Sequence, residues 1–319
     1  MTQTLPTPAR NRVLGFGACT LAGMFWGCGF FFGKIALAEM NSGAMVLYRF
    51  LFASLGLLPF VLTHRPGRNR PALSRKDWLI LLFASFLGVP LQFLFQFHGL
   101  ALTTVSHAAL MVGTMPVLLA VGATFYAHER LHPLGWVALF VSTIGAALIA
   151  LGGDHHAATS AANGPTLRGD LFVVFSLCIA LFWVLLNQRL VAHHSPIVIT
   201  AYGLCAGTVM LLLVVPFLYG LPPIHHISLK VWLALAASGL LCTASSTMLW
   251  NYGMTRVPAS QAGVLLNMEP LIGSLLGVFV LHEHLGSLGL LGGALILAAA
   301  ITLTTRSART QATPESIAF

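Results

Sequence analysis

One hydrophobic pattern occurs twice in this chain of 319 residues, and the two copies are 154 residues apart. The stretch from Ala108 to Gly135 returns without gaps as Ala262 to Gly289. The identical pairs are Ala108/Ala262, Pro116/Pro270, Phe125/Phe279, His128/His282, Glu129/Glu283, Leu131/Leu285, Leu134/Leu288 and Gly135/Gly289. Five long apolar segments lie between corresponding positions of the two copies. If each segment crosses the membrane once, this odd number of crossings gives the second copy the opposite orientation in the membrane to the first. Inverted repeats are typical of alternating-access transporters.

The composition places the chain in a membrane. Hydrophobic residues make up 57% of it and charged residues 8%, with a mean hydropathy of +0.87. A soluble surface of this size would need far more polar material. A membrane helix needs about 20 apolar residues, whereas a barrel would show alternating segments of about ten. We expect ten membrane helices, near residues 13–37, 44–63, 78–99, 106–126, 134–152, 169–189, 197–218, 231–251, 260–281 and 287–305.

These segments predict an all-α integral membrane fold in which ten transmembrane helices form two inverted five-helix repeats. The expected organisation is a cytoplasmic N-terminal tail 1–12, a first repeat 13–152, an exterior linker 153–168, a second repeat 169–305 and a cytoplasmic C-terminal tail 306–319. The linker is rich in Ala, Thr, Ser, Asn, Gly and Pro, as connecting segments are.

Basic residues predict the orientation, because Lys and Arg are retained on the cytoplasmic side. With the N-terminus inside, twelve of the 16 basic residues are cytoplasmic, Arg168 and Lys230 face out, and Lys34 and Arg49 lie within helices. Both termini are therefore expected in the cytoplasm, with the chain in a bacterial inner membrane. The net charge of +8 needs no nucleic-acid partner, since the run from His64 to Lys76 suits anionic lipid headgroups. The expected partners are the lipid bilayer, a small-molecule substrate and protons, without an obligate protein partner.

The segment His128–His132 matches the H-E-x-x-H motif of zinc metalloproteases. A membrane-embedded zinc protease is therefore one alternative function, and a non-transporting membrane scaffold is another. The second copy keeps His282 and Glu283 but has Gly286 in place of the second histidine. Because the duplicated pattern does not preserve this zinc ligand, we expect no metal, no cofactor and no catalytic residue. We interpret Glu129 and Glu283 as caps at the amino-terminal ends of the helices that follow them.

Polar groups inside a bilayer are costly, so each one needs a structural or functional reason. Glu269 is the most exceptional, because it lies in the middle of the ninth expected helix, directly before Pro270. The proline removes a backbone donor and is expected to loosen the helix there. Glu269 can be interpreted as a substrate or proton site, or as a protonated structural carboxyl. The candidates for a substrate pathway are Glu269, Asn267, Gln92, Gln96, His98, Trp183, Asn187, Tyr202, Ser246, Trp250 and Asn251.

Two basic residues, Lys34 and Arg49, lie near the exterior ends of the first two expected helices. Long basic side chains at such positions can extend to the lipid headgroups. Alternatively, the two charges attract anionic groups at the outer mouth of a pathway.

Several fragments, taken in order, resemble one known family. They are Phe25-Trp26-Gly27 with the later Lys34, Tyr48-Arg49-Phe50, Gly99-Leu100, the run from Pro116 to Glu129, Val257-Pro258-Ala259-Ser260, and Leu266-Asn267-Met268-Glu269-Pro270 with Glu283. Over essentially its whole length the chain is similar to the EamA family of the drug/metabolite transporter superfamily. The resemblance implies ten helices, cytoplasmic termini, two inverted repeats and a central cavity used to export amino acids or other small metabolites from bacteria. Thr114-Met115 precedes the proline of the first repeat where the second has Met268-Glu269, so only one central acidic residue is present.

We therefore expect a secondary transporter, not an enzyme, that moves a small metabolite, an amino acid or related compound, by alternating access, with export as the direction. The sequence lacks the G-x-x-x-x-G-K-[ST] signature of nucleotide-driven proteins. Proton coupling through Glu269 and facilitated export both fit these observations.

Overall fold

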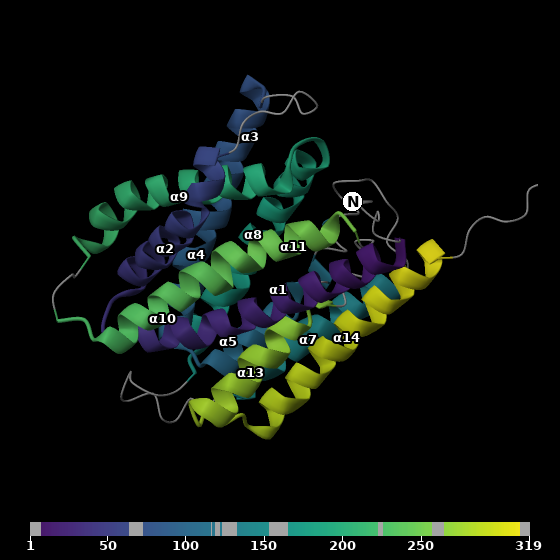
Figure 1. Ribbon diagram of the computed structural model, residues 1–319. Helices are drawn as coiled ribbons and strands as arrows, with labels where there is room; N and C mark the ends of the chain where they lie inside the picture. Colours follow the sequence, from purple (N-terminus) through teal and green to yellow (C-terminus); the bar gives the residue numbers. More distant parts are fainter. Residues whose placement is uncertain are drawn as a thin grey trace, which may run out of the picture.

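The computed structural model is a bundle of α-helices (Figure 1). It describes residues 8–63, 73–115, 117–118, 122, 133–152, 165–222, 226–256 and 265–312, and these residues contain no β-strand. A helix satisfies its own backbone N–H and C=O groups, which hydrocarbon cannot do for it. The predicted all-α class is therefore confirmed.

Most helices follow the expected segments, while the expected helices at 106–126 and 260–281 are described only in part. The first half contains α1 (Pro8–Leu37), α2 (Ser42–Thr63), α3 (Arg75–Phe86), the π-helical segment η1 (Leu87–Leu91), α4 (Gln92–Leu102), α5 (Val105–Val112) and α7 (Pro133–Gly152). The second half contains α8 (Leu167–His193), α9 (Pro196–Tyr219), α10 (Leu229–Gly239), the π-helical segment η3 (Leu240–Ser245), α11 (Ser246–Met254), α13 (Met268–Val280) and α14 (Ser287–Ala312).

Within the described residues, six helical stretches are long and apolar enough to cross a membrane. They are Val13–Leu37, Ser42–Leu62, Arg75–Leu102, Leu167–Val191, Pro196–Tyr219 and Leu229–Met254. Large apolar side chains also cover the outer surface, where Phe217 is 87% exposed and Leu213 is 73% exposed. Such a surface suits lipid and would aggregate in water. The chain is thus a multi-pass membrane protein, while the count of ten crossings stays a prediction.

The helix packing repeats with the 154-residue spacing of the sequence. α1 packs along α10, η3 and α11, and its counterpart α8 packs along α3, η1 and α4. Counterparts also contact each other, since α2 packs on α9 and α7 packs on α14, and Figure 1 shows α7 and α14 side by side. The two π-helical segments correspond as well, because adding 154 to 87–91 gives 241–245, which lies within η3. The two halves are therefore built from the same parts.

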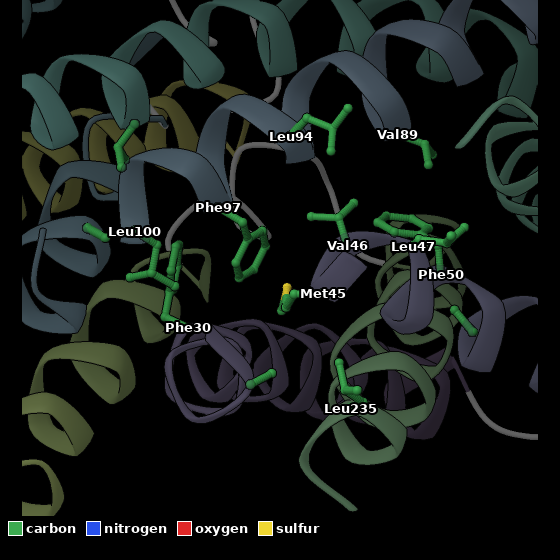
Figure 2. Packing of buried hydrophobic residues seen from close by; sticks show 14 of the residues in the cluster. Phe30, Met45, Val46, Leu47, Phe50, Val89, Leu94, Phe97, Leu100 and Leu235 are labelled. Carbon is green, nitrogen blue, oxygen red and sulfur yellow. The ribbon is translucent and has the colours of Figure 1, made fainter. Parts of the chain in front are cut away.

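The main hydrophobic core forms where α1, α2, α4 and α10 meet. Phe30, Met45, Phe50, Phe97 and Leu235 are each at most 3% exposed. Figure 2 shows their side chains gathering between these helices. The rings of Phe30 and Phe97 stack with centroids 6.3 Å apart. This core fixes the first-half helices against α10, and both phenylalanines also reach the cavity described below.

Glu269 occupies a different helical position from the one expected. α13 begins at Met268, which puts Glu269 in its first turn, and Pro270 follows there. The N–H groups of a first turn have no partner within the helix, so Pro270 costs no hydrogen bond. A carboxylate is also favoured near a helix amino terminus. The helix is interrupted at Leu266 and Asn267, one turn before Pro270, and α13 then begins with Pro270 in its first turn.

A close helix contact holds Glu269 in place. Gly27 of α1 faces α13, and a Cβ atom at Gly27 would lie 2.6 Å from the carbonyl oxygen of Glu269 and 3.0 Å from Cβ of Ile272. Only a residue without a side chain allows this approach. The backbone of Glu269 is thus pressed against the first helix.

Candidate functional site

A cavity of about 450 Å³ lies inside the bundle. Both halves contribute to one site, because residues of α1, α2, α3, η1, α4, α5, α8, α9, η3, α11 and the start of α13 line it. This volume lies in the range of pockets that bind small molecules. The cavity is therefore the candidate functional site.

The bundle has two ends, and the cavity extends toward one of them. We call the Asp77 end the one where α3 and α9 begin and α8 and α11 finish, and the Glu39 end the opposite one. Val191, Ile199 and Thr255 line the cavity and lie within a few residues of helix termini at the Asp77 end. No described lining residue lies in a terminal helical turn at the Glu39 end.

Arg49 lines the cavity from α2 and is 3% exposed. Its Nε donates to Oγ1 of Thr243 at 2.7 Å, and its Nη2 donates to the carbonyl oxygen of Cys242 at 3.2 Å. Its guanidinium carbon lies 5.1 Å and 5.0 Å from the ring centroids of Phe93 and Phe97, where cation–π attraction stabilises a desolvated cation. The expectation that Arg49 lies at the outer mouth is corrected, because these contacts draw its side chain into the bundle.

The π-helical segment η3 provides the contacts that Arg49 uses. A π-helical turn inserts an extra residue, interrupts the regular hydrogen-bond ladder and often marks a functional site. Thr243 and Cys242 both lie within this segment, and the Thr243 hydroxyl in turn donates to the carbonyl oxygen of Ser238 at 3.0 Å. The interrupted ladder therefore explains why α2 can anchor a buried cation on this helix.

Glu269 lines the same cavity from the start of α13. Within the described part of the chain, no hydrogen bond or ion pair of its carboxylate is present, and none joins it to Arg49. Neither residue is duplicated. Arg49 of the first repeat corresponds to Gly203 of the second, and Glu269 of the second repeat corresponds to Met115 of the first. The cavity thus holds one basic and one acidic side chain that are not joined by an ion pair.

Other predicted pathway residues also reach the cavity. Gln92, Gln96, Trp183, Asn187, Trp250 and Asn251 all line it. Gln92 is 7% exposed, and its Oε1 has no hydrogen-bond partner among the described residues. By contrast, Asn251 is occupied, because its Nδ2 donates to Oγ1 of Thr200 at 2.5 Å. Gln92 therefore offers a buried acceptor to whatever enters the cavity.

Four predicted pathway residues do not line the cavity. Asn267 is 4% exposed at the start of α13, and Ser246 is fully buried with its hydroxyl donating to the carbonyl oxygen of Thr243 at 3.2 Å. The His98 ring packs edge-on against Phe172, 4.9 Å between centroids. Tyr202 packs on Trp78 instead, 5.5 Å away. His98 and Tyr202 therefore pack between helices, whereas the Ser246 hydroxyl bonds within its own helical stretch.

Lys34 lies near the Glu39 end, where it lines a shallow pocket, and carbonyl oxygens of another helix accept hydrogen bonds from its ammonium group. Its Nζ donates to the carbonyl oxygens of Leu100 at 3.0 Å and of Thr103 at 2.5 Å. These carbonyls belong to the end of α4, where a helix has unsatisfied acceptors and a negative dipole end. Lys34 therefore caps α4 from α1.

Glu283 caps a helix, but not the one that follows it. Its carboxylate accepts from the backbone N–H of Val105 at 2.7 Å and of Ser106 at 2.8 Å, and from the Ser106 hydroxyl at 2.7 Å. The capped helix is α5 of the first half, so the expectation of a cap on α14 is corrected. The other predicted cap, Glu129, and the H-E-x-x-H segment 128–132 lie outside the described residues.

The sequence analysis did not identify Thr243, Phe93 and Phe97 as part of the site. Comparison of the two repeats could have drawn attention to Arg49. It corresponds to Gly203 at the spacing of 154 residues, so Arg49, like Glu269, is a charged residue that only one repeat carries. No sequence signal pairs Arg49 with Thr243, because the contact spans 194 positions.

Comparisons with known proteins agree with a duplicated transporter. The EamA-like transporter family matches the chain twice, over residues 13–151 and 167–305, which repeats the spacing of 154. An uncharacterized transporter of Archaeoglobus fulgidus is 27% identical over 88% of this chain and 94% of its own length. The inner membrane protein YtfF of Escherichia coli is 24% identical over 93% of this chain and 96% of its own.

One solved crystal structure also shares the fold. Its chain superimposes with a TM-score of 0.64 at 20% sequence identity, and the match covers 96% of this chain and 99% of that one. Because the family matches both halves and together most of the sequence, this chain belongs to the EamA-like transporter family.

Proposed function

We propose that the protein is a secondary transporter that exports a small zwitterionic metabolite, an amino acid or a related compound, across a bacterial inner membrane by alternating access. The observation that carries the proposal is the presence of Arg49 and Glu269 in one cavity without an ion pair between them. A zwitterion carries both complementary charges. Burying it against two unlike charges offsets the cost of removing it from water.

The charges have separate roles in this proposal. Arg49 uses two of its five N–H donors on Thr243 and Cys242, which leaves donors for a carboxylate of the substrate. Glu269 faces an ammonium group when ionised and carries a coupling proton when neutral. Gln92 accepts a hydrogen bond from the substrate through its unpaired Oε1.

The cavity wall near the second repeat suits the rest of the substrate. Gly203 occupies the place that corresponds to Arg49, and a Cβ there would have no neighbour closer than 3.6 Å. The atoms nearest to that Cβ are Oγ of Ser85 at 3.6 Å and Cδ1 of Leu81 at 3.8 Å, and Val89, Trp183 and Leu204 also line the cavity. The open wall at Gly203 therefore combines one hydroxyl with apolar surface. It would receive the apolar portion of a substrate whose charged end lies between Arg49 and Glu269.

Ten crossings with both termini in the cytoplasm complete the proposal. In that orientation the Asp77 end faces the cytoplasm, because the cytoplasmic basic residues gather there. The cavity extends toward this end, so opening of the Asp77 end would load substrate from inside.

The test is a screen of the purified protein against amino acids, other zwitterions, sugars and organic cations, followed by flux measurements in proteoliposomes with and without a pH gradient. Zwitterions are expected to raise the melting temperature, since a ligand that binds only the folded protein stabilises it. Arg49→Gln should lose the response to substrates that have a carboxylate. Stabilisation by uncharged sugars alone would contradict the proposal.

Glu269→Gln is the matched variant for coupling. It keeps the side-chain volume and a hydrogen-bonding group but removes the titratable proton, so the variant should elute as one folded species and lose most of its flux driven by a pH gradient. Glu269→Asp, which keeps the proton, is the control and should retain the dependence on the gradient. Unchanged flux and pH profile in Glu269→Gln would show that this carboxyl is structural.

A further inference from the structure

Two aromatic pairs connect the halves, one at each end of the bundle. The ring of Tyr48 on α2 packs edge-on against Trp232 on α10, with centroids 5.0 Å apart, at the Glu39 end. The ring of Tyr202 on α9 packs against Trp78 on α3, 5.5 Å apart, at the Asp77 end. Adding 154 to 48 and 78 gives 202 and 232, so the pairs are counterparts. Each end thus has the same aromatic contact across the repeats.

A polar contact lies beside the aromatic pair at the Glu39 end. Glu39, in the loop between α1 and α2, accepts from the backbone N–H of Ser228 at 2.7 Å and from its hydroxyl at 2.6 Å. Ser228 is the N-cap of α10. We call this contact the Glu39 latch. It joins the loop of one half to the first turn of a helix in the other.

The Asp77 end carries a contact at the corresponding place. Ser74 is the N-cap of α3 and the counterpart of Ser228, and its hydroxyl donates to Oδ2 of Asp77 at 2.6 Å. The same oxygen lies 3.3 Å from Nε2 of His194, in the connection between α8 and α9. We call the contact of Asp77 with His194 the Asp77 latch. It also joins a loop of one half to the first turn of a helix in the other half.

The two latches match in position but differ in chemistry. The Glu39 latch pairs a carboxylate with neutral donors, whereas the Asp77 latch pairs a carboxylate with a histidine. Histidine is the side chain whose charge ordinarily changes between pH 5 and 8. The Asp77 latch therefore gains an ion pair when His194 is protonated, while the Glu39 latch has no group of this kind.

We propose that the Glu39 and Asp77 latches hold opposite ends of the bundle closed, and that protonation of His194 shifts the protein toward the state closed at the Asp77 end. The inference rests on the proposed alternating access, and it names the contacts that break and form again at each end of the bundle. In that mechanism only one end opens at a time, so breaking one latch opens its end and favours closure of the other. Glu39 and Ser228 are exposed and the Asp77 side chain is 30% exposed, so water can take over the hydrogen bonds of these groups when a latch breaks, whereas the His194 side chain is 8% exposed.

Neighbouring charges do not replace either latch. Lys34 and Lys230 line a shallow pocket together with Glu39, and Lys34 is held by carbonyls of α4. Hydrogen bonds from Ser228 lower the pKa of Glu39, so this latch stays ionised between pH 5 and 8. In the turns of α3, α8 and α9 nearest to the Asp77 end, the other titratable and charged residues are Arg75, Lys76, Arg189, His193 and Tyr202.

The experiment measures distances between pairs of spin labels in a cysteine-free background reconstituted in nanodiscs. One pair, at Ala38 and Leu229, reports on the Glu39 end, and the other, at Leu79 and Ile197, reports on the Asp77 end; all four positions are exposed. Glu39→Gln should raise the open-to-closed ratio at the first pair, and Asp77→Asn should raise it at the second. The expected change is about two- to fivefold at each pair of labels, the size expected for losing one hydrogen bond or one partly exposed ion pair.

The pH response needs no latch substitution and keeps the proposal testable if a variant fails to fold. Lowering the pH from about 8 to about 5.5 should reduce the open fraction at Leu79 and Ile197. His194→Gln should abolish this response, whereas the adjacent His193→Gln, the matched control, should keep it. An unchanged distance distribution in the otherwise unsubstituted protein, loss of the response in both variants, or opening of the same end by Glu39→Gln and Asp77→Asn would overturn the proposal.

These distances are read without substrate, which separates the latches from the proposed substrate. If the ends respond but no zwitterion is transported, the substrate proposal fails and the latches stand. If zwitterions are transported but the spin-label distances at both ends do not change, the latch proposal is refuted and the substrate proposal stands.

Discussion

Nε of Arg49 donates a hydrogen bond to Oγ1 of Thr243 over 2.7 Å, and this contact ties α2 of the first half to the π-helical segment η3 of the second. The cation is thereby fixed in the cavity wall, where Phe93 and Phe97 cover it. Its position is set by the opposite repeat, so the geometry of the site depends on how the two halves pack.

Removing the Thr243 hydroxyl should destabilise the protein. Thr243→Val leaves a buried guanidinium N–H without an acceptor, which costs about 1–3 kcal/mol of unfolding free energy. The measurement is thermal unfolding of the purified protein, with Thr243→Ser as the control because it keeps the hydroxyl. Equal stability of Thr243→Val and the wild type would mean that another acceptor or water replaces the contact.

The carboxylate of Glu283 should stabilise α5 from the other half of the chain. Glu283→Ala removes the acceptor from two backbone N–H groups and the Ser106 hydroxyl, and loss of a helix cap costs about 1 kcal/mol. A double-mutant cycle with Ser106→Ala measures the coupling between the two side chains by thermal unfolding. Additive effects would contradict a direct interaction, whereas a combined loss smaller than the sum is expected.

The stability at low pH should depend on Glu39. Hydrogen bonds from the Ser228 hydroxyl and backbone lower the pKa of Glu39 below its ordinary value of 4.5. A lowered folded-state pKa contributes stability above the unfolded pKa, and the contribution is lost as the pH falls through the folded value. Melting temperatures between about pH 6 and pH 3 should therefore fall more steeply in the wild type than in Glu39→Gln. Parallel curves would show that the Ser228 contact does not persist.

The orientation of the chain can be tested with reporters. A reporter fused after Phe319 should be cytoplasmic and one inserted near Gly164 should be exterior, because the expected ten crossings would place twelve arginines and lysines on the cytoplasmic side and two outside. Each site is tested with alkaline phosphatase, which is active outside the cytoplasm, and with green fluorescent protein, which fluoresces inside it, so that each reporter is the control for the other. Both sites on one side of the membrane would refute the inverted arrangement.

Much of the fold could be predicted from the sequence. The expected helix at 197–218 is observed as Pro196–Tyr219, and the expected helix at 44–63 as Ser42–Thr63. Such segments are recognised because apolar length and local caps, such as the proline that opens α9, are properties of contiguous residues. The duplication was also readable, since it depends on comparing the chain with itself.

The candidate site was only partly predictable. Glu269 and Gln92 were identified because a polar group in an apolar segment is conspicuous, and both line the cavity. Ser246 and Tyr202 were equally conspicuous, but they do not line it. Lipid-facing and protein-facing positions are both apolar in a membrane helix, so sequence periodicity does not tell which face meets a neighbour.

The sequence by itself determined a duplicated, all-helical membrane chain with one central carboxylate. Only the tertiary structure decided that Arg49 turns inward to Thr243 and that Glu283 caps a helix 178 residues away. The physical reason is that a buried charge takes the hydrogen-bond partners that the packing of several helices brings within reach, and these partners are distant in the chain.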